Sequence, residues 1–515
     1  MRTLGSAVVL CLMGVVVAVG CASHVVDDAE LSVGVQQEAL ELNRACSDSF
    51  DSIYAQPRNL PRYDSSRRGD IVRCSMGRTV QLEEVKANLD ARGFKDIVAR
   101  NAVQLYRITY RTERLQRRGD VSSAIVVLPV QRFRLNADGT QTQVPEGADM
   151  VEVESIRRAG SKPLIVFGHG TIPYGPSCAY SKADPGSDTL DRELGALVAF
   201  ATQGHPVIMP DYIGFVAGSQ VTGYMLSEEE AHALLDATRA MRKLFRNVPD
   251  RVALVGHSQG GHAVLSAQAL ARSYGLSGQL TGVVAIAPYW APARGFGALF
   301  STDPKFNYNT TYHFPYLEFG IEYFYTHAEL YDGPGRGAQL FKEGVRDELA
   351  GIVSTCDWYP ALPRESWGDT AADFLDPNFY AAITACGVNR AACNSGIAAT
   401  WEQRFKADRP RLDRSGAPVL MWGGGQDVVI EPDVAKCAFD KISSDLPPNS
   451  GSAFFKVCGD SGADHESLIG NQLSWITRWI EARSRGGAEP ESCPGIEALQ
   501  GDGPLTCRTP PGNED

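Results

Sequence analysis

The residues best suited to chemistry stand in one short stretch, Gly256-His257-Ser258-Gln259-Gly260. This is the G-x-S-x-G pattern of a nucleophile elbow, in which a serine occupies a sharp turn between a strand and a helix. The apolar run at residues 252–255 predicts the strand, and residues 262–271 predict the helix. The pattern therefore predicts Ser258 as a nucleophile at the head of a helix, where the N–H dipoles favour an oxyanion. The alternative is a glycine-rich turn with an inert serine.

A serine hydroxyl is a poor nucleophile at neutral pH, so it needs a base, and the base needs an orienting acid. Enzymes built on this elbow supply them in the chain order serine, acid, histidine. Asp427 follows a predicted strand in a glycine-rich turn, and His465 follows the next strand. This order leaves His465 as the only available base, because the other histidines all precede Asp427: His24, His169, His205, His232, His257, His262, His313 and His327. Asp427 is the predicted acid, and its rivals are Asp413, Glu431, Asp433 and Asp464.

Two backbone N–H groups are expected to stabilise the negative charge that develops on the substrate oxygen. The first belongs to Gln259, the residue after the nucleophile. The second belongs to Gly170 or Thr171, because the strand predicted at residues 163–167 runs directly into Gly168-His169-Gly170-Thr171. A simple turn at the end of a strand is the alternative interpretation of this segment.

Strand and helix patterns alternate around these residues. Strands are predicted at residues 103–110, 122–130, 163–167, 206–209, 252–255, 282–287, 418–422 and 452–457, and helices at residues 188–202, 228–245, 433–446 and 468–483. The first two strands are expected to open the sheet as an antiparallel pair. The later alternation indicates a mostly parallel sheet with helices on both faces, so the predicted fold class is α/β.

Residues 288–413 interrupt this alternation and are rich in aromatic side chains. We expect them to form a cap inserted above the site, because aromatic, partly helical insertions create apolar pockets over such sheets. The alternative is that the aromatic side chains only pack the core of the insertion itself.

Four motifs together resemble the secretory lipase family of α/β-hydrolases: Gly168-His169-Gly170-Thr171, Asp211-Tyr212-Ile213-Gly214, Gly256-His257-Ser258-Gln259-Gly260-Gly261 and Gly425-Gln426-Asp427. The resemblance spans roughly residues 103–483. It implies an α/β-hydrolase fold with a lid inserted before the acid. It also implies hydrolysis of carboxylic esters through an acyl-enzyme, with Ser258 as nucleophile, His465 as base, Asp427 as acid and no cofactor.

The N-terminus has the pattern of an export signal at residues 1–20, with Arg2 followed by an apolar run at residues 4–19. Ala18-Val19-Gly20-Cys21 resembles a bacterial lipoprotein box, which predicts lipidation of Cys21 and an outer-membrane or cell-surface location. The alternative is an ordinary secretory signal cut near Ala22 or Ser23. Residues 21–101 are then predicted as a tether and extension, residues 102–485 as the hydrolase domain, and residues 486–515 as a Pro/Gly-rich tail.

Ten cysteines remain after Cys11 and Cys21 are set aside, and an even number in an exported chain predicts disulfides. The simplest pairing joins near neighbours: Cys46–Cys74, Cys386–Cys393, Cys437–Cys458 and Cys493–Cys507, leaving Cys178 with Cys356. The family resemblance makes Cys437–Cys458 more credible.

The 515 residues are 43% hydrophobic and 21% charged, with a formal net charge of −12, which argues against nucleic acid as a partner. The predicted partners are an ester substrate and, through the N-terminal lipid, a membrane. Three alternatives share the predicted fold. They are a serine peptidase, an acyltransferase that passes the acyl group to an alcohol, and a non-catalytic surface binding protein.

Overall fold

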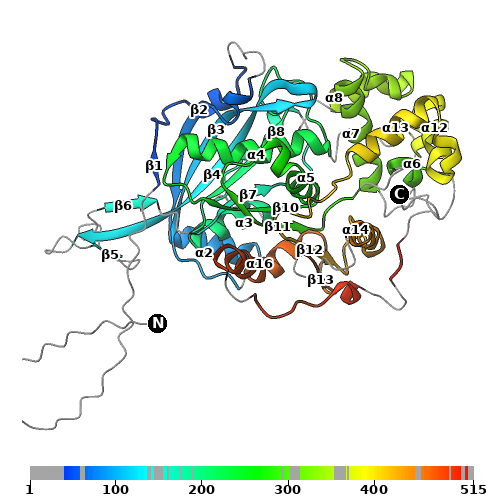
Figure 1. Ribbon diagram of the computed structural model, residues 1–515. Coiled ribbons are helices and arrows are strands. Elements are labelled where there is room, and N and C mark those ends of the chain that lie inside the picture. Colours follow the sequence, from blue (N-terminus) through cyan, green and yellow to red (C-terminus); the bar gives the residue numbers. More distant parts are fainter. Residues whose placement is uncertain are drawn as a thin grey trace, which may run out of the picture. The chain divides into compact units, whose positions relative to one another are not determined.

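The computed structural model describes residues 40–507 (Figure 1), apart from 58–63, 95, 136–140, 144–154, 159–161, 174, 187–190, 291–294, 302–313, 353–355, 357–366, 368–369, 447–453, 487–488 and 500–504. The predicted signal segment and Cys21 lie outside the described residues.

One large sheet dominates the described part of the chain, with the strand order β13-β12-β11-β10-β7-β8-β4-β3-β2. Its parallel strands are β7 (Leu164–Gly168), β8 (Val207–Ile213), β10 (Arg251–His257), β11 (Gln279–Ile286), β12 (Val419–Gly424) and β13 (Phe455–Asp460). The antiparallel strands are β2 (Ile71–Val80), β3 (Ala102–Arg114) and β4 (Arg118–Leu135), with the short β5 (Gln141–Gln143) and β6 (Ser155–Arg158) paired to β4. The predicted α/β fold with a mostly parallel sheet is confirmed.

The sheet begins one strand earlier than predicted. The sequence pattern opens the sheet at residues 103–110, but β2 precedes that strand and pairs with it in antiparallel register. Cys74 and Val80 are buried, whereas Met76 is exposed. β2 is the last named strand of the sheet, and its outer side is paired through a single bridge between Ser75 and Ser47. Its weak apolar pattern explains why the sequence places residues 71–80 only in an N-terminal extension.

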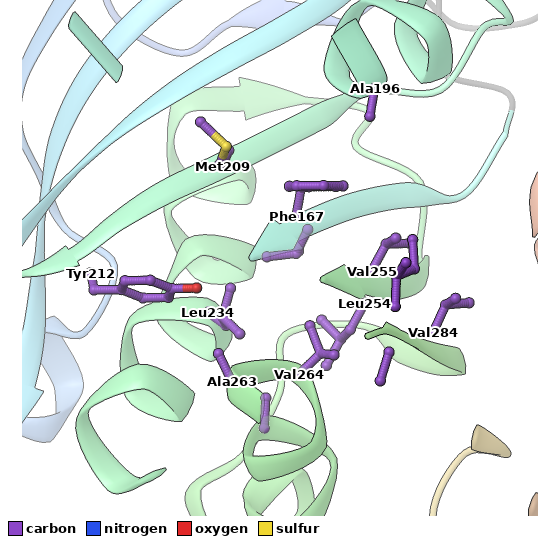
Figure 2. Close-up of a cluster of buried hydrophobic side chains, with 14 of the residues drawn as sticks. Phe167, Ala196, Met209, Tyr212, Leu234, Leu254, Val255, Ala263, Val264 and Val284 are labelled. Atoms are coloured by element: carbon purple, nitrogen blue, oxygen red, sulfur yellow. The ribbon is translucent and has the colours of Figure 1, made fainter. Parts of the chain in front are cut away.

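Helices cover both faces of the sheet. Figure 1 shows α4 (Ser227–Leu244) and α5 (Gln259–Tyr274) on one side, and α2 (Leu82–Ala91), α3 (Arg192–Thr202) and α16 (Ser467–Arg485) on the other. The central strands are therefore buried on both faces, which explains their continuous runs of Val, Leu and Ile. Figure 2 shows Phe167 of β7, Val255 of β10 and Val264 of α5 within one cluster of hydrophobic side chains, and all three are fully buried. This core anchors the ends of the strands that carry the predicted site.

The insertion between β11 and β12 is largely helical. It contains α6 (Gly295–Leu299), α7 (Phe314–Tyr331), α8 (Glu343–Ile352), α11 (Ala371–Phe374), α12 (Pro377–Val388) and α13 (Gly396–Ala407). Its described aromatic rings pack mainly on one another, with Phe324 in contact with Phe296, Phe379 and Trp401. For these side chains the insertion's own core is the correct interpretation. Phe306, Tyr308 and Tyr312 lie outside the described residues.

Five disulfides cross-link the chain. Cys46–Cys74, Cys178–Cys356 and Cys386–Cys393 form as predicted. The other two predicted pairs, Cys437–Cys458 and Cys493–Cys507, are wrong, because the structure pairs Cys437 with Cys507 and Cys458 with Cys493.

The exchange of partners follows from the path of the tail. The tail runs back along β13, where the Gly459 N–H donates to Pro494 O at 2.9 Å and Leu499 is buried. This path brings Cys493 to the buried Cys458 and carries the chain on toward Cys437 on α14 (Pro432–Asp445). Nearness in sequence does not reveal such a path.

Candidate active site

Ser258 occupies a strained turn between β10 and α5. Its φ of 55° and ψ of −117° are rarely adopted by a residue with a side chain. Glycine is required on both sides, because a Cβ on Gly256 would lie 2.0 Å from Gly260 O, and a Cβ on Gly260 would lie 1.9 Å from Gly168 O. The Ser258 N–H donates to Ile286 O at 2.9 Å, which ties the turn to β11. The turn thus has the geometry of a nucleophile elbow.

Asp427 and His465 meet beside this turn. His465 Nδ1 lies 2.8 Å from Asp427 Oδ2, and the Asp427 side chain is fully buried. The other carboxylate oxygen, Oδ1, accepts the N–H groups of Val429 at 2.8 Å and Ile430 at 2.7 Å. These two bonds fix the carboxylate, which in turn fixes the imidazole ring and leaves Nε2 as the nitrogen available for proton transfer.

The rival acids have other partners. Asp413 accepts from Arg272 Nη2 at 2.7 Å, and Asp464 accepts from the Ser467 N–H at 2.7 Å. Among the described residues, Asp427 is the carboxylate that contacts the His465 ring.

The two residues proposed for the second oxyanion donor differ in their bonding. The Gly170 N–H donates to Glu193 Oε1 at 2.8 Å, so it is already engaged. The Thr171 N–H has no partner among the described residues, and the Thr171 hydroxyl lies 2.9 Å from the Tyr224 hydroxyl. The Gln259 N–H stands in the first turn of α5, where backbone donors have no partner within the helix. Gln259 and Thr171 are therefore the stronger pair of donors.

A buried glutamate–histidine pair that the sequence does not reveal involves His257, the residue before Ser258. His257 Nδ1 lies 2.8 Å from Glu193 Oε1, and His257 Nε2 lies 3.0 Å from the backbone oxygen of His465. The carboxylate that binds Gly170 thus also reaches the loop that carries the base.

A second such pair involves His262 of α5, four residues after Ser258. His262 Nδ1 lies 2.7 Å from Glu230 Oε2, and His262 Nε2 lies 2.6 Å from Asp408 O. The other Glu230 oxygen accepts from Gln259 Nε2 at 2.7 Å. Burial has the largest influence on the pKa of His262 and lowers it, but the charge of Glu230 and its hydrogen bond outweigh burial, so the pKa is raised. Asp408 belongs to the insertion, so this pair joins the elbow to the insertion.

The insertion also approaches the expected oxyanion side. The Tyr224 N–H donates to Thr326 Oγ1 of α7 at 3.3 Å, while the Tyr224 hydroxyl contacts Thr171. No cluster of three or more metal-binding side chains occurs among the described residues. In the same part of the chain, no helix has the length and apolar character needed to cross a membrane.

The fold and the elbow define the class as α/β-hydrolase, and solved structures agree with it. The rice cell wall degrading esterase LipA from Xanthomonas oryzae aligns with a TM-score of 0.56 and 18% identity, over 80% of this chain and 97% of that one. Candida antarctica lipase A in its closed state aligns with a TM-score of 0.53 and 16% identity, over 87% of this chain and 89% of that one. At such low identity these similarities establish the fold alone.

Sequence comparison finds a partial match to one family. Residues 184–289 match the secretory lipase family. Lipase A from Moesziomyces aphidis is 33% identical over 152 residues, which cover 28% of this chain and 32% of that protein. The chain thus aligns with about a third of that relative, and the resemblance to secretory lipases drawn from the motifs is confirmed.

Proposed function

We propose that the protein is a serine hydrolase of carboxylic esters, a lipase or esterase that acts on lipid or other ester substrates through an acyl-enzyme. The observation that carries the proposal is the hydrogen bond between His465 Nδ1 and the buried Asp427 carboxylate, which two backbone N–H groups also bind. Ser258 stands in a turn with a strained backbone conformation. The match to secretory lipases supports ester hydrolysis in general.

The reaction begins when Ser258 Oγ attacks the ester carbonyl and His465 Nε2 takes its proton. Asp427 holds His465 in the required tautomer and stabilises the imidazolium that forms. The backbone N–H groups of Gln259 and Thr171 stabilise the oxyanion. Collapse of the tetrahedral intermediate releases the alcohol, which takes the proton from His465. Water, activated by the same imidazole, then hydrolyses the acyl-enzyme.

The test is hydrolysis of p-nitrophenyl esters with short to long acyl chains by the parent protein and by Ser258→Ala. The variant should lose about 10⁴- to 10⁶-fold in kcat while the fold stays intact. Activity that rises toward long chains supports a lipase, and a preference for short chains supports an esterase. Residual activity within tenfold of the parent contradicts the assignment of Ser258.

We further propose that the protein is exported and attached to a membrane through lipid on Cys21. The five disulfides and the match to a secretory family support export. The lipoprotein-box pattern before Cys21 supports the anchor.

A further inference from the structure

His257 connects two segments that a serine hydrolase has to keep in position, the loop of His465 and the segment of Gly170. It precedes Ser258 in the chain, and its buried ring lies between the Glu193 carboxylate and the backbone oxygen of His465. Glu193 Oε1 also accepts the Gly170 N–H. One chain of hydrogen bonds thus runs from the segment before Thr171, through Glu193 and His257, to the residue proposed as the base.

The chemistry of these partners determines how many protons the pair holds. A backbone carbonyl can only accept a hydrogen bond, so His257 Nε2 must carry a proton to bind His465 O. An ionised carboxylate also only accepts, so His257 Nδ1 must carry a proton to bind Glu193 Oε1. Both bonds form together when His257 is an imidazolium and Glu193 is its counter-charge.

We infer that Glu193 and His257 are a positioning pair, which holds the backbone of His465 and the Gly170 segment in register with Ser258 only while His257 carries both protons. The inference rests on the proposed function, since the role of the pair is to place the base and the oxyanion donors. Among the described residues, neither side chain forms a hydrogen bond with the Ser258 hydroxyl or the His465 ring, and the His257 ring packs on the His465 ring with 4.6 Å between their centroids.

The surroundings of His257 favour the charged ring. Burial is the largest influence and lowers the pKa of His257. The hydrogen bond and charge of Glu193, the charge of Glu466 and the His465 carbonyl outweigh it, so the pKa is raised. The charged and titratable groups described around the pair are Glu193 from α3, Glu466 and His465 from the loop before α16, Asp427 behind His465, and Tyr180, Asp191 and Tyr212 beside Glu193. The charged His257 ring therefore holds the His465 backbone fully at a pH below the ordinary pKa of histidine. This positioning is lost as the pH rises through the raised pKa of His257.

The main experiment compares Glu193→Gln with the parent in ester hydrolysis from pH 6 to pH 10. Glutamine can still accept from Gly170, but it provides no negative charge to keep the second proton on His257. We expect kcat at neutral pH to fall by about 10- to 100-fold with KM little changed, because the base loop is misplaced. The alkaline fall in kcat should begin at least about one pH unit lower in the variant than in the parent. At a pH above the alkaline fall of the parent, the kcat values of the parent and of Glu193→Gln should become equal.

The matched control is Glu229→Gln. Glu229 is an equally buried glutamate that binds Arg114 Nη1 at 2.7 Å and the Leu115 N–H at 3.2 Å, away from His257. It should lower stability without moving the pH profile. The inference is overturned if the ratio of kcat between Glu193→Gln and the parent is the same at every pH. It is also overturned if Glu229→Gln shifts the pH dependence of kcat equally, because either result shows a merely structural role.

Two measurements do not depend on catalysis. Hydrogen exchange of the backbone amides at residues 460–467 should speed up at pH 8 in Glu193→Gln but not in Glu229→Gln, and unchanged exchange would overturn the inference. NMR of ¹⁵N-histidine-labelled parent, assigned with His257→Gln, should show both His257 nitrogens protonated at pH 7; a neutral ring would also overturn it. If the parent lacks Ser258-dependent esterase activity, the proposed function fails, and these two measurements still decide whether the pair positions the loop.

Discussion

Replacing Asp427 by Asn tests the proposed triad most directly, because the structure dictates how the new amide must lie. Asp427 Oδ1 accepts two backbone N–H groups, from Val429 and Ile430, and Oδ2 accepts from His465 Nδ1. In Asp427→Asn the amide oxygen should take the place of Oδ1, since an NH₂ group there would leave two N–H donors unsatisfied at about 1–3 kcal/mol each. The NH₂ group then faces His465 Nδ1.

That orientation reverses the tautomer of the base. His465 Nδ1 must accept from the amide, so the ring proton moves to Nε2, which can no longer take the proton of Ser258. We expect kcat to fall by about 10⁴-fold, as when a triad acid is replaced by its amide in a serine protease. This corresponds to about 5.5 kcal/mol of transition-state stabilisation. The melting temperature should change little, because Asp and Asn have nearly the same shape.

The assay is kcat and KM on a p-nitrophenyl ester, with circular dichroism to verify the fold. Asp464→Asn is the matched control, because Asp464 adjoins His465 but has an exposed side chain that binds the Ser467 N–H. It should stay within about threefold of the parent, as for a surface substitution. An Asp427→Asn variant within tenfold of the parent, or an equal loss in Asp464→Asn, would refute the assignment of the acid.

Two further predictions concern the ends of the chain. Cys458→Ser combined with Cys493→Ser should lower the free energy of unfolding by about 2–4 kcal/mol in urea titrations, because it frees a loop with a sequence separation of 35. A non-reducing peptide map with a Cys437–Cys458 link would contradict the pairing behind that figure. Cys21→Ser should move the protein from the membrane to the soluble fraction of fractionated cells, and unchanged membrane association would count against lipidation at Cys21.

The parts of the fold that the sequence predicted well are those determined by local pattern. The elbow can be predicted because the tight turn accepts only glycine at positions 256 and 260. The central strands can be predicted because burial on both faces requires continuous apolar runs. Asp427 can be predicted from the order of serine, acid and histidine along the chain and from the glycine-rich turn in which it stands, without knowledge of any contact. The sequence does not predict β2, because a strand at the end of the sheet with few buried side chains has a weak apolar pattern.

The features that escaped prediction depend on contacts between segments far apart in the sequence. Nothing near Gly170 indicates that its N–H is taken by a carboxylate 23 residues later, which leaves Thr171 as the stronger oxyanion candidate. The histidines at positions 257 and 262 could be excluded as bases from chain order, yet their charge state follows only from what both ring nitrogens touch. Each of them faces a carboxylate on one side and a backbone carbonyl on the other. Burial lowers the pKa of both histidines, but the carboxylate partners outweigh burial and raise it, so both sites favour the charged ring; one is tied to the loop of His465 and one to the insertion through Asp408. Ion pairs beside the elbow thus hold three segments: the loop of His465, the Gly170 segment and the insertion. Loss of a proton from His257 should loosen the loop of His465, whereas loss of a proton from His262 should loosen the contact with Asp408.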